Sequence, residues 1–111
     1  MRILSIETSC DDTGIAILEV SKTGAFNILS NIIASQIEVH KQYGGVYPMM
    51  AKREHQKNIL PVLIKALKKA DLLKLKIVTN LPPDKFTTIN KILEREQELH
   101  KKIIPFLKKW N

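Results

Sequence analysis

Residues 3–20 read ILSIETSCDDTGIAILEV, and this stretch decides the fold. Two apolar runs of strand length, Ile3–Ile6 and Ile15–Val20, flank a short polar segment. Both runs are rich in β-branched residues, which favour extended backbone, and the polar residues between them are common in turns. The sequence therefore predicts a strand, a tight turn and a second strand.

The chain continues with a third predicted strand and a helix. An apolar run from Phe26 to Ile37 follows a short turn, and we expect it to bend near Asn31 because it is long for a single strand. Three strands joined by short turns favour an antiparallel meander. From Met49 to Ala70 the apolar residues recur at helical spacing, and Pro61 is expected to kink or split this helix. The predicted class is α/β.

The carboxy-terminal part, residues 71–111, is predicted to form a linker and a basic amphipathic helix. Leu75–Thr79 fit either a short strand or an extension of the preceding helix, before a proline pair interrupts the chain. Apolar residues at helical spacing predict a last helix from about Phe86 to Leu107, with its final turn bent by Pro105. Residues 1–70 are predicted to form a separate domain, or part of one.

Length and composition limit the class of protein. A chain of 111 residues with 44% hydrophobic residues suffices for one modest domain or a piece of a larger one. Its single cysteine excludes an internal disulfide and fits a reducing compartment. No apolar stretch approaches the length of a membrane span, and the amino terminus lacks the layout of a signal peptide. We therefore expect a cytoplasmic protein without a membrane partner.

The net charge of +7 is unevenly distributed. Residues 1–40 carry two basic and five acidic side chains, whereas residues 41–111 carry sixteen and six. A basic surface of this kind is typical of nucleic-acid binding, but lysine pairs on solvated helix faces explain the same count. The charge alone leaves RNA contact open.

The polar turn holds side chains suited to an anion or a cation. Its members are hydroxyls, a thiol and paired carboxylates: Thr8, Ser9, Cys10, Asp11, Asp12 and Thr13. Hydroxyls and closely approaching main-chain N–H groups can donate to phosphate oxygens, and adjacent carboxylates can hold a divalent cation or orient water. The alternative is an ordinary hairpin turn. Because no histidine is close in sequence to activate Cys10, we expect a small turn residue there rather than a nucleophile.

Two motifs occur in order along the first 70 residues. The first is IETSCDDT at residues 6–13. The second consists of SQI at 35–37, His40, YGGVYP at 43–48, Ala51, Arg53 and His55. With both motifs, the region from Met1 to about Ala70 resembles the amino-terminal portion of the tRNA N6-adenosine threonylcarbamoyltransferase family, a Gcp-like family formerly described as O-sialoglycoprotein endopeptidases.

The resemblance implies a partial actin-like ATPase (ribonuclease H-like) domain, in which the first two strands and their turn face the phosphates of a nucleotide. Members of the family are acyltransferases of tRNA processing. They transfer a threonylcarbamoyl group from threonylcarbamoyl-AMP to N6 of adenosine 37 in tRNAs that read ANN codons. They work with partner subunits and with iron (Fe) or another divalent metal. By resemblance, Thr8–Thr13 lie near the phosphate of the intermediate or the metal.

Glu7 and the second motif each have two interpretations. Glu7 lies in the first predicted strand and either points into the cleft or faces outward. The segment around the glycine pair is either a structural crossover into the helix or, as the resemblance implies, a partner interface. Its residues are Tyr43, Gly44, Gly45, Val46, Pro48 and Arg53. His40 and His55 flank this segment, and we expect them to form local hydrogen bonds rather than to bind metal.

The chain also departs from the pattern of the family. The family's metal ligands are a His-x-x-x-His pair and an aspartate near the carboxy terminus. The three histidines here, at positions 40, 55 and 100, are 15 and 45 residues apart, so we expect no tightly bound metal. Residues 71–111 match no core motif, and residues 92–96 look like part of a charged helical insertion.

The extent of the resemblance, well under a third of a complete enzyme, leads us to interpret the chain as a fragment that is inactive by itself. Its first strand lacks a second neighbour unless Leu75–Thr79 supplies one, and an unpaired apolar edge favours self-association. Two alternatives stay open: a non-catalytic module that binds protein or RNA in the same complex, and a fragment of another actin-like ATPase or sugar kinase. The second motif argues against the kinase alternative, since those kinases do not share it.

Overall fold

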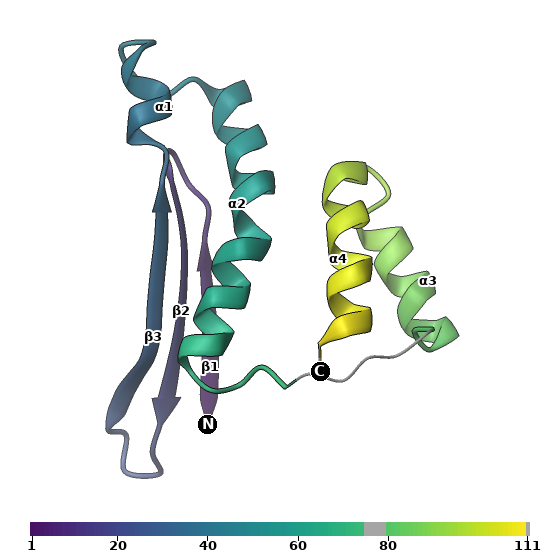
Figure 1. Ribbon diagram of the computed structural model, residues 1–111. Helices are drawn as coiled ribbons and strands as arrows, with labels where there is room; N and C mark the ends of the chain where they lie inside the picture. Colours follow the sequence, from purple (N-terminus) through teal and green to yellow (C-terminus); the bar gives the residue numbers. More distant parts are fainter. Residues whose placement is uncertain (75–79, 111) are drawn as a thin grey trace. The chain divides into compact units, whose positions relative to one another are not determined.

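The computed structural model describes residues 1–74 and 80–110, and its contacts divide the chain into two units, Met1–Leu72 and Leu73–Asn111. The first unit is a three-stranded antiparallel sheet in the order β1-β2-β3, followed by two helices (Figure 1). The second unit contains two helices. The elements are β1 (Arg2–Glu7), β2 (Asp12–Val20), β3 (Phe26–Ser35), α1 (Ile37–Lys41), α2 (Pro48–Lys69), α3 (Pro83–Ile92) and α4 (Gln97–Lys109). The predicted α/β class and antiparallel meander are confirmed.

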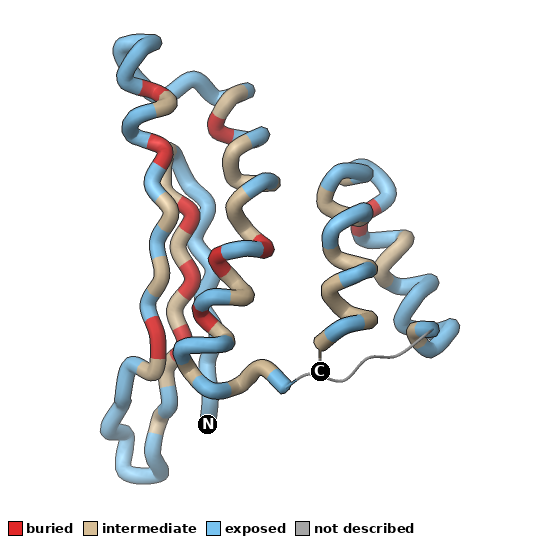
Figure 2. The backbone as a smooth tube through the Cα atoms, viewed as in Figure 1, coloured by how far each residue is buried: buried red, intermediate tan, exposed pale blue. Residues whose placement is uncertain are grey.

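One face of the sheet packs against α2 and carries the core of the first unit. Ile15 and Ile17 of β2 are each 1% exposed and contact Val62 and Ala66 of α2 within one buried cluster. Helix α2 contacts β2 and β3 (Figure 1), whereas all six residues of β1 are exposed (Figure 2). We call the side of the sheet that faces α2 the covered face.

The opposite side, the open face, is left uncovered within the first unit. Successive residues of a strand point to opposite sides, so Gly14, Ala16 and Leu18 lie on this side. The register places Glu7 opposite Gly14 and Ile3 opposite Leu18. The open face therefore combines apolar side chains with the carboxylate of Glu7.

Helix α2 continues through Pro61, so the prediction that the helix splits at this residue is wrong. Pro61 is exposed, while its neighbours Leu60 and Val62 are buried. Proline removes the hydrogen bond to the carbonyl of Lys57, which is also an exposed residue, so water can satisfy that carbonyl. Packing on both sides of Pro61 then holds the helix together.

The end of the third strand differs from the prediction. Strand β3 ends at Ser35. The register between β2 and β3 shifts between Ile17 and Leu18, and this shift leaves Leu29 of β3 without a partner in β2. The sequence did not predict α1, which follows at once. Gln36 begins this change, because its N–H donates to the oxygen of Asp11 at 2.6 Å while its own oxygen accepts from the first turn of α1.

In the second unit, two helices replace the single predicted helix over residues 86–107. Helix α3 ends at Ile92 and α4 begins at Gln97, so the charged segment at residues 92–96, which looked helical, mainly forms the turn between them. Leu93 in this turn is buried, at 9% exposed. Pro105 lies inside α4, which continues to Lys109. The segment Leu75–Thr79, expected to be a short strand or an extension of the preceding helix, lies outside the described residues.

None of the helices in residues 1–74 and 80–110 is long and apolar enough to cross a membrane.

Candidate functional site

The turn between β1 and β2 has a constrained backbone. Thr8, Ser9 and Cys10 are exposed, and Asp11 is half-buried. The N–H of Asp12 donates to the oxygen of Ser9 at 3.4 Å, which closes the turn. Cys10 has a φ of 48°, in the left-handed region that residues with a side chain disfavour. The fold therefore depends on the backbone of Cys10, while its thiol is exposed.

Glu7 is tied to this turn through Ser9. Its Oε1 accepts a hydrogen bond from the main-chain N–H of Ser9 at 2.7 Å. Hydrogen bonds from the Ser9 side chain and then from its main chain hold the pKa of the Glu7 carboxyl below its usual range, with a smaller contribution from the charge of His55. Glu7 is therefore a carboxylate at neutral pH.

A hollow of about 230 Å³ lies on the open face beside the turn. Its lining residues are Ser5, Glu7, Asp12, Gly14, Ile15, Ala16, Asn31 and Ile33. Oδ1 of Asp12 is buried and, among the described residues, has no hydrogen-bond partner. A Cβ atom at Gly14 would lie 3.9 Å from Cβ of Glu7, so the absence of a side chain there keeps the hollow open. Two carboxylates thus meet at one depression.

The predicted turn residues separate into three groups. Glu7 and Asp12 line the hollow, whereas Thr8, Ser9 and Asp11 do not. Thr13 is completely buried, and its Oγ1 lies 2.8 Å from Nδ1 of His55 on the covered face. Strand alternation explains the difference, because neighbouring residues of β2 point to opposite sides of the sheet. The side chains of Thr8, Ser9 and Asp11 do not line the hollow, and the backbone of the turn connects these residues to it.

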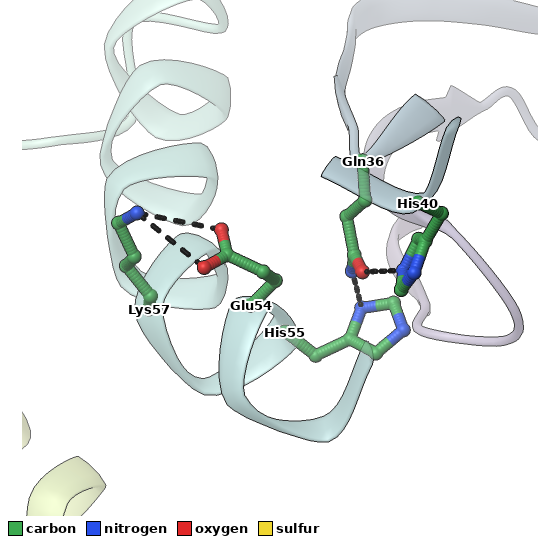
Figure 3. Close-up of polar contacts among 5 residues, drawn as sticks. All are labelled: Gln36, His40, Glu54, His55 and Lys57. Atoms are coloured by element: carbon green, nitrogen blue, oxygen red, sulfur yellow. Dashed lines mark hydrogen bonds and ion pairs between the residues drawn. The ribbon is translucent and has the colours of Figure 1, made fainter. Parts of the chain in front are cut away.

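Beneath the turn, a polar cluster connects β2, α1 and α2. Gln36 lies between the rings of His40 and His55 (Figure 3), with Oε1 2.8 Å from Nε2 of His40 and Nε2 3.1 Å from Nδ1 of His55. Nε2 of His55 is 3.2 Å from the oxygen of Cys10. Glu54, next to His55 in sequence, pairs instead with Lys57 at 3.4 Å. The predicted local hydrogen bond is confirmed for His40, whereas the partners of His55 are 19 to 45 residues away, so the local bond predicted for His55 is wrong.

Sequence reasoning missed the role of Gln36. Its side chain is 1% exposed and bonds both histidines, although it is 19 residues from His55. One local signal was present: Gln36 and His40 are four residues apart, a spacing that brings side chains together in a helix. The contact with His55 had no local signal, because it depends on the packing of α2 against the sheet.

The predicted interface segment forms an exposed loop. Tyr43, Val46 and Tyr47 are exposed, and the two tyrosine rings stack with centroids 6.0 Å apart. Gly44 and Gly45 have φ values of 70° and 156°, which require glycine. The loop ends at Pro48, the first residue of α2, and Arg53 on this helix is exposed. These residues are accessible, and their role as a partner interface stays a prediction.

The described residues contain no group of three or more histidine, cysteine, aspartate or glutamate side chains placed to hold a metal ion. Both ring nitrogens of His40 and of His55 already have hydrogen-bond partners. A metal ligand must offer a free nitrogen lone pair. Within the described residues, neither histidine is therefore placed to bind a metal.

Part of this chain is similar to a known protein family. Residues 27–79 match the family model described as tRNA N6-adenosine threonylcarbamoyltransferase. The amino-terminal part of this chain is homologous to that family. The resemblance based on the two motifs is confirmed, and the sheet and α2 form the amino-terminal part of an actin-like ATPase fold.

Three curated relatives carry the same description. The chain is 54% identical over 72 residues to tRNA N6-adenosine threonylcarbamoyltransferases of Persephonella marina and of a Sulfurihydrogenibium species. It is 53% identical over 72 residues to that of Fusobacterium nucleatum. Each match covers 65% of this chain and 20% of the relative. The chain thus spans about one fifth of the length of the threonylcarbamoyltransferases that it matches.

Proposed function

We propose that the first unit of this chain is the amino-terminal wall of the active site of a tRNA N6-adenosine threonylcarbamoyltransferase. The complete enzyme would transfer the threonylcarbamoyl group of threonylcarbamoyl-AMP to N6 of adenosine 37 in tRNAs reading ANN codons. The observation that carries the proposal is the pair of carboxylates, Glu7 and Asp12, at the hollow beside the β1–β2 turn. The names of the relatives supply the reaction class.

The geometry suggests separate roles for the turn and the carboxylates. Two carboxylates repel a phosphate unless a donor lies between them. We propose that Asp12 accepts one hydrogen bond from a water, whose second O–H donates to the phosphate of the intermediate, while Glu7 holds the turn through Ser9. The exposed hydroxyl of Thr8 is placed on the turn itself and would donate directly to a phosphate oxygen. Asp12 is suited to this role because its buried Oδ1 has capacity for a hydrogen bond that no described residue uses.

Other parts of the activity are assigned to residues outside these 111. We propose that the complete enzyme holds iron or another divalent metal through such residues. No step of the proposed role is derived through a metal, since the described residues do not fit one. The isolated chain should therefore give no transfer from threonylcarbamoyl-AMP to tRNA, and turnover by it would refute its role as one wall of a larger site.

A chimera tests the role of the carboxylates. Met1–Leu72 would replace the corresponding segment of the Persephonella marina relative, and transfer from threonylcarbamoyl-AMP to tRNA would be measured. Glu7→Gln and Asp12→Asn should each lower the transfer rate roughly 10- to 100-fold, the effect of losing about one charged hydrogen bond. Glu19→Gln is the matched control, because Glu19 lies at the far end of β2 and pairs with Arg2. Equal transfer rates for all three variants would contradict the proposal.

The surroundings of the site lead to two further proposals. The loop at residues 43–48 is proposed to contact a partner subunit in the cytoplasm, where tRNA is modified. Strand β1 exposes Ile3, Leu4 and Ile6, and pairs on one side with β2. Such an edge accepts another strand, so the isolated chain is proposed to self-associate. Sedimentation of a compact monomer at high concentration would count against it.

The second unit favours a different function for residues 73–111. This segment carries nine lysine or arginine and four acidic side chains. A basic helical pair can bind the phosphates of RNA, with an affinity that falls steeply as salt rises. If so, the full chain should bind tRNA more tightly than residues 1–72, and the difference should vanish in high salt. Equal tRNA affinities of the full chain and of residues 1–72 would show that residues 73–111 do not contribute to RNA binding.

A further inference from the structure

A directional series of hydrogen bonds connects the loop at residues 43–47 with the β1–β2 turn. It starts at the main-chain N–H of Tyr47, which donates to Nδ1 of the buried His40 at 3.3 Å. Since Nδ1 accepts, the proton of the neutral ring is on Nε2. Nε2 then donates to Oε1 of Gln36 at 2.8 Å. The position of the loop thereby fixes the orientation of the Gln36 amide.

Gln36 passes this orientation on to His55. With Oε1 facing His40, the amide nitrogen of Gln36 faces Nδ1 of His55 at 3.1 Å and donates to it (Figure 3). Oγ1 of Thr13 lies 2.8 Å from the same Nδ1, and its hydroxyl can also donate. The proton of neutral His55 is therefore on Nε2, which donates to the oxygen of Cys10 at 3.2 Å. Every donor in the series faces an acceptor.

We infer that His55 is a positioning residue for the β1–β2 turn, and that Gln36 and the carbonyl of Cys10 together hold it in the Nε2–H tautomer. Cys10 requires support, because its φ of 48° is disfavoured for a residue with a side chain. The hydrogen bond from His55 reaches the carbonyl of this residue. The inference adds to the proposed function. Only one consequence rests on that function, namely that the geometry of the turn affects the reaction.

The opposite tautomers would leave the carbonyl of Cys10 without a donor. When the N–H of Tyr47 moves away, His40 can carry its proton on Nδ1 and offer the lone pair of Nε2 to Gln36. The Gln36 amide would then turn over and present Oε1 to His55, whose proton would have to move to Nδ1. Nε2 of His55 would now face the oxygen of Cys10 with a lone pair. Two acceptors repel each other, so the carbonyl of Cys10 opposes this rearrangement.

Long-range ¹H–¹⁵N NMR of the 111-residue chain tests the series by reading both tautomers. At pH ~8 imidazole is ordinarily neutral, and we expect Nε2–H for His40 and for His55. Tyr47→Pro removes the donor N–H to His40 but should leave Nε2–H on His55, because the carbonyl of Cys10 can only accept. Tyr47→Ala keeps the N–H and is the matched control, which should leave both tautomers unchanged.

A second variant removes the dependence on the proline substitution. Gln36→Glu keeps the shape of the side chain but presents an acceptor to both rings, so His55 should gain a proton on Nδ1 while His40 keeps Nε2–H. The inference is overturned if His55 carries its proton on Nδ1 in the unaltered chain, if a folded Tyr47→Pro chain loses Nε2–H from His55, or if Gln36→Glu leaves His55 unchanged. These measurements need neither tRNA nor threonylcarbamoyl-AMP, so their outcome is separate from that of the proposed function.

Discussion

The two faces of the sheet in the first unit use the same three strands for different purposes. On the covered face, Ile15 and Ile17 pack against α2, and Thr13 contributes to the polar cluster with His55. On the open face, Asp12 and Glu7 line a hollow in which a buried carboxylate oxygen has no described partner. The comparison shows that stability is concentrated on one face, while chemistry is available on the other.

Truncation of an isoleucine on each face should give the largest contrast. Ile15→Ala leaves a cavity in the core and should lower the free energy of unfolding by about 2–5 kcal/mol. Ile33→Ala lies on the open face, where Ile33 is 61% exposed, and should cost less than about 1 kcal/mol. Urea unfolding of residues 1–111 measures both values. Equal losses would show that the faces do not differ in packing.

Removal of the polar support on the covered face should have the next largest effect. His55→Ala leaves the buried Gln36 amide and the Cys10 carbonyl short of a partner, and should cost about 1–3 kcal/mol of unfolding free energy. Arg53→Ala, on the same helix but exposed, is the control and should stay within about 0.5 kcal/mol. A loss at Arg53 as large as that at His55 would contradict the assigned support.

Substitution of Gly14 should separate stability from function on the open face. Gly14→Ala places a Cβ 3.9 Å from its nearest neighbours and should stabilise the fold by about 0.5–1 kcal/mol, because alanine has less chain entropy to lose. In the chimera, the added methyl group should slow transfer by narrowing the hollow. Gly24→Ala makes the same change at a φ of 85° and should destabilise instead. A destabilised, fully active Gly14→Ala chimera would refute the prediction.

The smallest effect should come from the titration of Glu7. Its lowered pKa means that ionisation contributes stability that is fully present above the unfolded pKa of about 4.5 and is lost as pH falls through the lower folded pKa. Ser9→Ala removes the largest cause, so the pKa of Glu7 measured by ¹³C NMR should rise. The pKa of Glu98, lowered by Lys101, should stay unchanged in this variant. An unaltered Glu7 pKa would show that the Ser9 hydroxyl is not the cause.

The strands and the turn were predictable because their signals are local. The β-branched runs around residues 6–13 specify β1 and β2, and the alternation within β2 separates Asp12 from Thr13. The break between α3 and α4 also has a local signal that the prediction overlooked. Leu93 and Leu99 are six residues apart, a spacing that places them on different sides of one continuous helix. With two helices, Leu93 is buried in the turn between them and Leu99 is half-buried on α4.

By itself, the sequence determined the three-stranded meander, the long helix α2 and the resemblance to the transferase family, because period, turn chemistry and the two motifs are properties of neighbouring residues. Tertiary structure alone decided which face of the sheet is covered and which histidine supports the turn. His55 is 45 residues from Cys10 and 19 from Gln36. These groups meet because α2 buries its apolar side against β2 and β3, and that packing carries His55 to the turn.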